Sequence, residues 1–395
     1  MPAIPVIVLG HGITALGVIR ILARDGIQAF VADSTDPLLH RSRRFRSVPV
    51  RLPPGDEGGL GAWLEALPIP RAVLMPCSDH WVSEVSKLSP RSRDRFPASV
   101  GSAESIVRLV DKGRFAQTVR ESNTPHPWSR EVEAESDLAT VPDSVFGSAI
   151  LKPRDSQSFV QRFEVKALRV SSREDTAIKL RRLVAEGFPV ILQEYIPGPP
   201  THHYFVDGFV DRTGAVRAVF VRQRLRMFPE DFGNSSHMVS VTPDRAGESV
   251  AAITSLLKDI GYRGVFSTEF KQDSRDGKFR VLEVNARPWW FVEFAARCGV
   301  DVCRMAYDDA LERPVETVDR YEVGRKLVFP YTDYFACIAM HARGELSATE
   351  WLRSWLTSQQ PVFQFSDPLP AIWGGVNILA KFAWRRLRHL WSLTK

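Results

Sequence analysis

The residues best suited to chemistry lie in one stretch, Phe266–Trp290, which contains Glu269, Glu283, Asn285 and Arg287. Two carboxylates on one face repel each other unless a cation lies between them. Hard oxygen ligands of this kind suit Mg²⁺, which binds one or two carboxylates together with substrate phosphates. The stretch therefore predicts a site for a metal and a phosphate group. The alternative is a solvated polar strand face on which the arginine neutralises a glutamate.

This stretch has the pattern of two strands joined by a polar turn. In the second strand, alternation predicts two faces, one with Val281, Glu283, Asn285 and Arg287 and the other with Leu282 and Val284. A hairpin that folds about Asp276 with an odd-length loop places Glu269 opposite Glu283. A two-residue turn at Asp276 and Gly277 would instead place the glutamates on opposite faces. We expect the odd-length loop.

Composition indicates a soluble globular protein of two or three domains. The chain has 395 residues, of which 44% are hydrophobic and 25% charged, with a net charge of +6. That charge is modest and nucleic-acid-binding motifs are absent, so no nucleic-acid partner is expected. The four cysteines lack metal-ligand spacing, which is typical of free thiols in a reducing cytosol. The opening MPAIPVIVLGHG has no basic region and the chain has no run of about eighteen apolar residues, so we expect neither a signal peptide nor a membrane span.

The chain opens with a strand–helix–strand pattern. An apolar strand at Val6–Leu9 leads into a glycine-rich turn at Gly10 and a helix, and a second strand, Ile27–Ala32, ends at Asp33. This order predicts a Rossmann-like domain. A glycine turn followed by an acidic residue also fits NAD binding. We favour a turn that packs helix on strand or meets a non-nucleotide substrate.

A third buried strand, Ala72–Met75, ends in the polar segment 76–80. Open α/β sheets place ligands at such strand ends. Within this segment, we expect Asp79 to cap the next helix rather than to act as a catalytic acid. The basic run Arg41–Arg46 is expected to be a solvated loop, with contact to an anionic substrate as the alternative.

A second unit combines lysines with a strand that runs into a linker. Lys112 precedes a helix, and an apolar strand delivers Lys152 just before a proline and a polar loop, Arg154–Phe159. Another strand, Val190–Glu194, continues into a linker whose backbone and glutamate can hydrogen-bond a flat heterocycle. The alternative for Lys152 is a surface lysine at the end of a strand.

The order of these parts resembles the ATP-grasp superfamily. Asp-Lys before a helix is followed by Ile-Leu-Lys-Pro, by Gln-Glu-Tyr-Ile-Pro-Gly and by Glu…Glu-x-Asn-x-Arg. Within the superfamily, the chain is most similar to carbamoyl-phosphate-synthase-like carboxylate–amine ligases, which include D-aspartate ligase-like proteins. RMFPEDFGNSS (226–236), RGELSATEWLRS (343–354) and SDPLP (366–370) also resemble segments of that branch.

The resemblance implies a role for each matching residue. The phosphates of a nucleotide would be bound by Lys112 and Lys152. The metal ligands would be Glu269, Glu283 and Asn285. The adenine would lie against Gln193, Glu194, Tyr195 and Ile196, with His202 or His203 near the ribose. Arg287 would stabilise the developing acyl phosphate, and a substrate carboxylate or phosphate would be held by Arg222, Arg224 and Arg226. The expected catalytic set is Arg287, Lys152 and Arg222.

Two departures from the family pattern stand out. The loop after the second lysine usually carries several glycines, but here it reads Pro-Arg-Asp-Ser-Gln-Ser-Phe. Phosphate contacts there are expected from Ser156, from Ser158 or from backbone amides. Trp289 and Trp290 follow the arginine where small residues are common, and we expect them to narrow the acceptor side.

The predicted fold is α/β, with a Rossmann-like pre-ATP-grasp domain, a two-lobed ATP-grasp fold and a C-terminal helical region. The expected boundaries are 1–105, 106–310 with a small lobe near 148–195, and 311–395. A helix is predicted at Ser347–Thr357. The tail 371–395 is basic and rich in tryptophan, and from about Val376 it would form an amphipathic helix. Docking of this helix on the protein itself is slightly favoured over contact with an anionic membrane.

The expected activity is ATP-dependent ligation of a small-molecule carboxylate to an amine through an acyl phosphate, with release of ADP and phosphate. ATP and Mg²⁺ are the implied cofactors, with Mn²⁺ as an alternative metal. Two lysines and a metal cluster directed at polyphosphate are what phosphoryl transfer requires. The alternatives are a carboxylase or phosphotransferase of the same fold and a non-catalytic nucleotide-binding regulatory protein. We expect a cytoplasmic location, with peripheral contact to the inner face of the membrane as the alternative.

Overall fold

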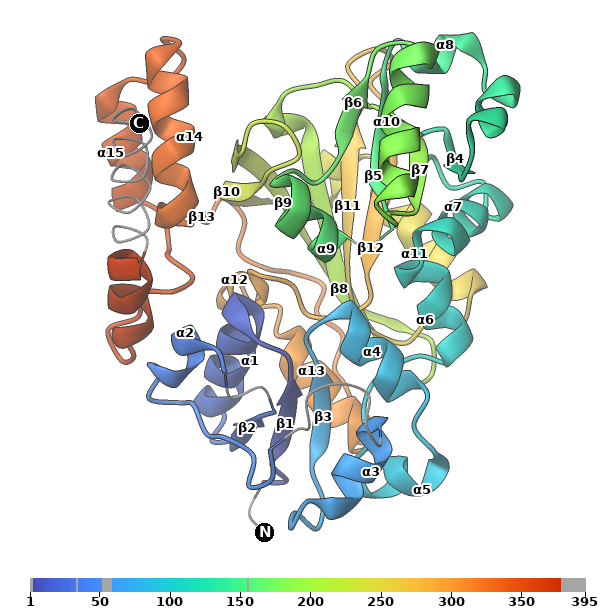
Figure 1. The fold of residues 1–395 in the computed structure, drawn as a ribbon. Helices are drawn as coiled ribbons and strands as arrows, with labels where there is room; N and C mark the ends of the chain where they lie inside the picture. The colour runs from blue at the N-terminus through green and yellow to red at the C-terminus, as the bar shows by residue number, and fades with distance from the viewer. Residues whose placement is uncertain (1–2, 33–34, 52–58, 155, 378–395) are drawn as a thin grey trace, which may run out of the picture.

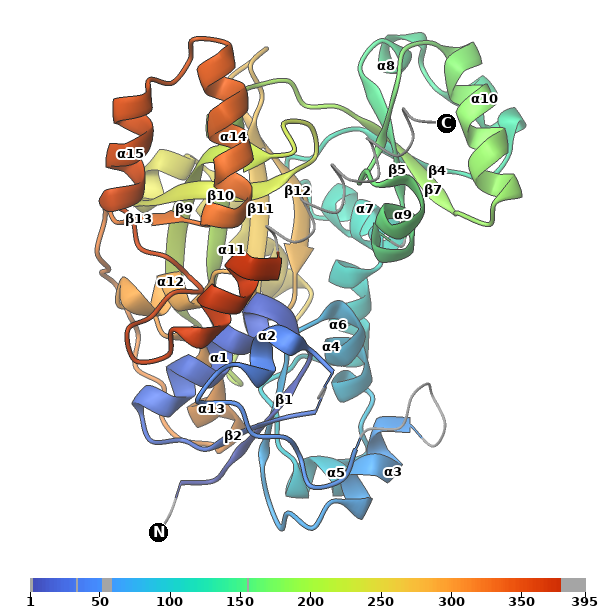
Figure 2. The same cartoon turned by 60° about the vertical axis from the view of Figure 1, so that its left-hand side comes forward.

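The computed structural model describes residues 3–32, 35–51, 59–154 and 156–377, and within them the strands form three sheets (Figure 1). A three-stranded sheet belongs to the N-terminal domain, a four-stranded sheet to a small lobe and a six-stranded sheet to a large lobe. Figure 2 shows the small lobe standing apart from the large lobe, with the N-terminal domain beneath the large lobe. This arrangement of helices and sheets confirms the predicted α/β class.

The N-terminal domain is built on a parallel sheet in the order β2-β1-β3. Its strands are β1 (Val6–Leu9), β2 (Ala29–Val31) and β3 (Val73–Pro76). Every residue of β1 and β3 is buried, because parallel strands are covered on both faces. Helix α1 (Gly12–Arg24) connects β1 to β2, which confirms the strand–helix–strand opening. Asp33, on which the NAD alternative depended, lies outside the described residues.

Short helices follow around this sheet and lead toward the small lobe. They are α2 (Pro37–His40), α3 (Gly59–Ala66), α4 (Asp79–Ser86), α5 (Pro90–Arg95), α6 (Ala103–Val110) and α7 (Lys112–Glu121). Serine or aspartate caps begin α2, α4, α5, α6 and α7, where a side-chain oxygen accepts a hydrogen bond from a backbone N–H of the first turn. Local sequence therefore sets where these helices start.

The small lobe is an antiparallel sheet in the order β4-β7-β5-β6 with helices packed on it. The elements are β4 (Ser129–Val132), β7 (Val190–Glu194), β5 (Ala149–Pro153), β6 (Leu168–Val170), α8 (Asp143–Phe146), α9 (Ser156–Phe163) and α10 (Arg173–Ala185). The expectation of a polar loop at Arg154–Phe159 is wrong, because α9 begins at Ser156. Phe159 is fully buried against Phe163 and Phe188, and this apolar contact holds the helix on the sheet.

The large lobe is an antiparallel sheet in the order β12-β11-β8-β9-β10-β13. The strands are β12 (Phe279–Asn285), β11 (Gly264–Gln272), β8 (His203–Val210), β9 (Val216–Phe228), β10 (Asn234–Val241) and β13 (Lys326–Val328). Neighbouring residues face opposite cores: Val265 packs with α12 (Val292–Arg297) and α13 (Val302–Ala310), whereas Phe266 packs with α6 and α11 (Ser249–Asp259).

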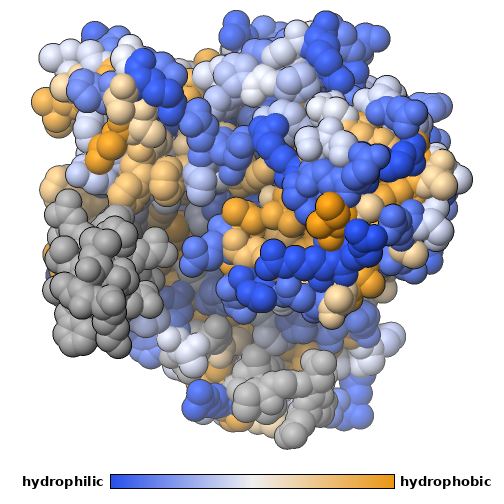
Figure 3. Space-filling model, turned by 45° about the horizontal axis from the view of Figure 1, so that its top comes forward, coloured by the Kyte–Doolittle hydropathy of each residue, from blue (hydrophilic) through white to orange (hydrophobic). Residues whose placement is uncertain are grey.

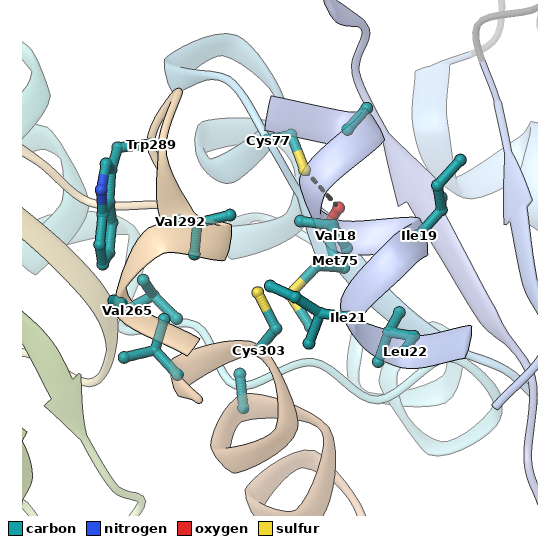
Figure 4. Close-up of a cluster of buried hydrophobic side chains, with 14 of the residues drawn as sticks. Val18, Ile19, Ile21, Leu22, Met75, Cys77, Val265, Trp289, Val292 and Cys303 are labelled. Carbon is teal, nitrogen blue, oxygen red and sulfur yellow. Dashed lines mark hydrogen bonds between the residues drawn. The ribbon is translucent and has the colours of Figure 1, made fainter. Parts of the chain in front are cut away.

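A buried cluster joins the N-terminal domain to the large lobe (Figure 4). Val18 and Ile21 of α1 and Met75 of β3 lie beside Val292 of α12 and Cys303 of α13. These side chains are withdrawn from water to 8% exposure or less, so separating the two domains would expose a continuous apolar surface. The N-terminal domain is therefore packed firmly against the large lobe.

The C-terminal part is only partly helical. Strand β13 extends the large sheet by pairing with residues 237–239 of β10, so the expectation of a purely helical region from 311 onward is wrong. Helices α14 (Pro330–Ala342) and α15 (Ala348–Leu356) follow. The predicted helix at Ser347–Thr357 is confirmed, and the side chains of Ser347 and Glu350 form its capping box.

Two buried aspartates attach this C-terminal part to the rest of the protein. Asp333 of α14 accepts hydrogen bonds from Arg226 at 2.9 and 2.7 Å and from the indole of Trp355 at 2.7 Å. Asp367 accepts from Arg20 at 2.9 Å and from the hydroxyl of Ser42 at 2.6 Å. A buried carboxylate needs several such partners to offset its lost hydration.

Most of the predicted amphipathic tail lies outside the described residues, which end at 377. A helix covers 369–377, so it begins before the expected start at Val376. Trp373 lies under the guanidinium of Arg41 at 4.6 Å. The face shown in Figure 3 mixes hydrophilic and apolar side chains. Within the described residues, no helix is both long and apolar enough to cross a bilayer.

We predict that Asp333→Ala lowers the free energy of unfolding by about 3–5 kcal/mol at pH 7, because it leaves Arg226 buried without its counter-charge. Desolvation acts to raise the pKa of Asp333, but the bonds from Arg226 and Trp355 outweigh it and hold the pKa below its ordinary value. The stabilisation is therefore present above the unfolded-state pKa of about 3.9 and is lost as pH falls through the lower folded-state pKa.

Urea unfolding followed by fluorescence at pH 7 and at acidic pH measures this effect. The matched control is Asp319→Ala, which removes an exposed carboxylate. Equal shifts of the midpoint in the two variants at pH 7 would show that the Asp333 contacts contribute nothing.

Candidate active site

Two cavities meet at the edge of the large sheet. The larger, of about 910 Å³, lies between the β1–α1 loop, the start of α4, helices α6 and α7, and strand β12. The smaller, of about 160 Å³, lies between the small lobe and the large lobe. Four residues line both cavities: Lys152, Gln193, Leu282 and Glu283. A ligand in either cavity can therefore contact these four side chains.

The hairpin of β11 and β12 places Glu269 directly opposite Glu283, as predicted. The predicted odd-length loop is wrong, however. Gln272 pairs with Phe279, which leaves the even-length loop 273–278, and a bulge at Leu282 then restores the pairing of the two glutamates. The local geometry of the turn and the bulge together produce this register.

The bulge also changes which residues share a face of β12. Val281 was expected beside Glu283, but it is buried in the same core as Val284 and Ala286. Leu282 was expected on the opposite face, but it lines both cavities with Glu283. Simple alternation fails here because the extra residue shifts the pleat by one position.

An arginine and a histidine contact the first glutamate. Oε1 of Glu269 lies 2.6 Å from Nδ1 of His203 and accepts a hydrogen bond from Arg224 at 3.0 Å. Desolvation acts to raise the pKa of Glu269, but Arg224 and His203 outweigh it and hold the pKa below its ordinary value. Desolvation, with the nearby Arg224 charge, lowers the pKa of His203 to about 4, so its ring is neutral at pH 7.

The two histidines expected near the ribose have different surroundings. Nδ1 of His202 lies 3.1 Å from the carbonyl oxygen of Gln272, and the ring lines neither cavity. His203 lines the smaller cavity instead. His203 is the first residue of β8, and its side chain points at Glu269 across the sheet, whereas His202 lies in the preceding turn.

The two predicted phosphate lysines lie on either side of the cavity junction. Nζ of Lys152 is 3.8 Å from a carboxylate oxygen of Glu283, which is half-exposed. Lys112 begins α7, lines the larger cavity and donates to the carbonyl oxygen of Pro153. Both ammonium groups thus lie next to strand β5, where negative charge on a ligand would be attracted.

Arg287 is held by an aspartate from the N-terminal domain. Its guanidinium donates to both oxygens of Asp79, at 2.8 and 3.3 Å, and to Oδ1 of Asn285 at 2.9 Å. The expectation that Asp79 caps a helix is wrong, because Ser78 is the cap of α4 and accepts from the backbone of Trp81. Asp79 instead fixes the orientation of the predicted catalytic arginine.

The three arginines of β9 have different surroundings. Arg222 is buried, donates to Asp207 at 2.6 Å and stacks over Phe205 at 3.9 Å. It lines neither cavity, so its predicted catalytic contact is not supported by its position. Arg226 donates to Asp333. Of these three arginines, Arg224 lines the smaller cavity.

The predicted adenine segment lines the smaller cavity. Gln193 faces both cavities, and three following residues line the smaller one: Glu194, Tyr195 and Ile196. The carboxylate of Glu194 accepts from Arg275 at 2.6 Å and from the backbone of Trp128 at 3.2 Å. This linker is therefore held in place by contacts to both lobes.

Several cavity residues were not singled out from the sequence. Lys166, Lys271 and Phe232 line the smaller cavity, and His11, His80 and Arg154 line the larger one. Lys271 had a readable signal, because it stands two residues after Glu269 on the same strand. Desolvation, with the Arg224 charge, lowers the pKa of Lys271 to about 8.

The two tryptophans that follow Arg287 lie in different surroundings. Trp290 lines the larger cavity and is 43% exposed. Trp289 is buried in the core beneath α12 and lines neither cavity. Only one of the pair can therefore touch a ligand.

The oxygen donors suit a hard cation. Glu269 and Glu283 face each other in register, and Asn285 follows two residues later on the same strand. His203 and Arg224 both contact Oε1 of Glu269. Within the described residues, no group of three or more His, Cys, Asp or Glu side chains is arranged to hold a metal. Two carboxylates and an amide are the kind of oxygen donors that Mg²⁺ binds together with phosphate and water.

Comparison with known proteins points to one fold. No protein-family profile matches the chain. The chain is 25% identical over 246 residues to the D-aspartate ligase of Enterococcus faecium (strain Aus0004), which covers 60% of this chain and 58% of that protein. The chain thus spans a little over half the length of this curated relative.

Solved structures match over most of the chain. Biotin carboxylase from Campylobacter jejuni, in a complex with a β,γ-ATP compound, has a TM-score of 0.64 and 16% identity, covering 82% of this chain and 74% of that one. Carboxyaminoimidazole ribonucleotide synthase from Aspergillus clavatus, complexed with ATP, has a TM-score of 0.62 and 14% identity, covering 82% and 81%. L-amino acid ligase from Bacillus licheniformis has a TM-score of 0.58 and 13% identity, covering 80% and 76%. The chain therefore has the ATP-grasp fold that these ligases share.

Proposed function

We propose that this protein is an ATP-dependent ligase that joins a carboxylate to an amine through an acyl-phosphate intermediate. The observation that carries this proposal is the junction of the two cavities, where Lys152 lies 3.8 Å from Glu283 and Glu283 faces Glu269. A phosphoryl group placed there touches the contents of both cavities. The homologous D-aspartate ligase and the shared fold support the same activity.

The smaller cavity would hold the nucleotide. Its adenine would lie against the linker of Glu194, Tyr195 and Ile196, and its phosphates would extend toward Lys152 and Lys112. Cations in a partly buried cavity attract polyphosphate more strongly than cations in open water, because the surrounding dielectric is lower. The neighbouring carboxyaminoimidazole ribonucleotide synthase was solved with ATP, which supports the use of ATP by this fold.

Glu269, Glu283 and Asn285 would hold Mg²⁺, or Mn²⁺ in its place. Such an ion supplies charge stabilisation to phosphoryl transfer when it is bound. The contribution of the chain itself is to keep the carboxylate of Glu269 ionised: Arg224 and His203 hold the pKa of Glu269 below its ordinary value. A glutamate kept anionic in this way remains a ligand even at mildly acidic pH.

The larger cavity would hold the carboxylate and the amine. A carboxylate oxygen attacks the γ-phosphorus and ADP leaves, and the amine nitrogen then attacks the acyl carbon and displaces phosphate. Arg287, oriented by Asp79 and Asn285, would stabilise the charge that develops on the acyl phosphate. The walls of the cavity, including Trp290, would limit the access of water to this labile intermediate.

A release assay for ADP and phosphate across amino acids and small acids, each paired with candidate amines, tests the proposal. The ligase reading requires substrate-dependent ADP release together with a condensed product whose mass equals the sum of the substrates less water. ADP release that depends on bicarbonate alone would favour a carboxylase. Nucleotide binding without turnover for any pair would favour a regulatory protein.

We predict that Glu283→Gln reduces turnover by at least about 100-fold, because the amide keeps the shape but loses the charge that a metal ion needs. The variant should fold, since Glu283 is half-exposed. Steady-state turnover, with circular dichroism as the folding check, measures this. Glu316→Gln, at an exposed position, is the control, and turnover of Glu283→Gln near that of this control would remove Glu283 from the site.

We predict that Lys152→Met weakens the binding of a non-hydrolysable ATP analogue by at least about tenfold, because it removes a charge-assisted phosphate contact. Thermal stability should barely change, since the 3.8 Å pair with Glu283 lies at a partly solvated site. Calorimetric titration gives the affinity. An unchanged dissociation constant would identify Lys152 as an ordinary strand-end lysine.

A further inference from the structure

The connection after β5 has an unusual composition for a segment next to phosphates. Residues 154–167 contain no glycine, and helix α9 occupies most of them. Beyond the first turn of such a helix the backbone N–H groups are engaged within the helix, so only the first turn can present N–H groups to a phosphate. If the smaller cavity holds a polyphosphate, side chains can supply further contacts on this side.

Lys166 lies where such a contact is needed. It follows α9, directly precedes β6 and lines the smaller cavity. Its ammonium donates to Oδ1 of Asn234, the first residue of β10. Because β6 belongs to the small lobe and β10 to the large lobe, this hydrogen bond crosses the space between the lobes.

The charges around this ammonium are those of the proposed phosphate and metal site. Its electrostatic neighbours are Glu283, Glu269, Arg224 and Lys152. As a whole residue Lys166 is exposed, but desolvation at the cavity lowers the pKa of its ammonium, and the two glutamates act to raise it. The ammonium end is therefore directed inward while the rest of the residue remains near the surface.

The neighbouring strand is anchored so that the lysine cannot easily withdraw. Arg169 of β6 donates to Asp231 at 2.7 and 3.1 Å. Its guanidinium also lies 4.0 Å from the ring centre of Tyr195 and 5.7 Å from that of Phe232. These contacts fasten the start of β6 to the β9–β10 loop, three residues after Lys166.

We propose that Lys166 is a phosphate-binding residue of the nucleotide site, which supplies from a side chain the contact that a glycine-rich loop would supply from its backbone. This inference rests on the proposed ATP-dependent function. In the absence of a nucleotide the ammonium bonds Asn234, and when a polyphosphate enters, the ammonium turns from the amide to a phosphate oxygen. A charge-assisted bond to phosphate is stronger than one to a neutral amide, which gives the exchange its direction.

The competing explanation is that Lys166 only fastens the two lobes together. Asn234→Ala separates the two roles, because it removes the bond between the lobes but leaves the ammonium in place. Lys166→Met removes both the bond and the charge, and Lys166→Arg keeps the charge. Lys258→Met, at an exposed position on α11, is the matched control.

Calorimetric titration of the full chain with a non-hydrolysable ATP analogue and with adenosine tests the proposal. We expect Lys166→Met to weaken binding of the analogue at least tenfold and binding of adenosine less than twofold, because only the analogue carries phosphates. Lys166→Arg should recover most of the affinity, and Asn234→Ala and Lys258→Met should bind the analogue within twofold of the wild type.

Two results overturn the assignment while leaving the ligase proposal intact: wild-type affinity for the analogue in Lys166→Met, or equal weakening in Lys166→Met and Asn234→Ala. Equal loss of adenosine and analogue binding would likewise show a structural role. If the wild-type protein itself does not bind the analogue, the proposed function fails and this inference fails with it.

Discussion

The pairing of Glu269 with Glu283 is the constraint on which the rest of the site depends. Carboxylates on directly opposed residues of an antiparallel pair have Cβ atoms about 4.5–5.5 Å apart, and their repulsion is strong where water is scarce. The structure offsets this cost with two cations and a neutral imidazole from separate elements. Arg224 comes from β9, His203 from β8 and Lys152 from the small lobe. The contact between Lys152 and Glu283 therefore links the small lobe to the large lobe.

Strand β9 carries three arginines along one face. Arg222, Arg224 and Arg226 are two residues apart along the strand, so they lie on the same face. Arg222 pairs with Asp207, and Arg226 pairs with Asp333. The middle arginine is thus the one directed at Glu269. A shift of register by one residue would separate all three from their partners, so the buried ion pairs specify the alignment of the strand.

The N-terminal domain contributes to the site through one ion pair and through its buried contact with the large lobe. The cluster around Val18 and Val292 packs this domain on the large lobe, and Asp79 then reaches Arg287 from the start of α4. A residue more than two hundred positions away in sequence thereby orients the guanidinium. The larger cavity is bounded by both domains, so its shape depends on their firm packing.

The sequence by itself determined the order of the chemical groups and the elements that carry them. Alternation and turn formers predicted the strand–helix–strand opening, the helix at Ser347–Thr357 and the hairpin, because these features depend on neighbours a few residues apart. The pairing of Glu269 with Glu283 was also predicted, but through an odd-length loop that the structure does not have. Tertiary structure decided the rest. The bulge at Leu282 depends on how β12 packs, the burial of Arg222 depends on Asp207, and the choice of His203 over His202 depends on which side chain faces Glu269 across the sheet. Such contacts join distant parts of the chain, so local pattern cannot specify them.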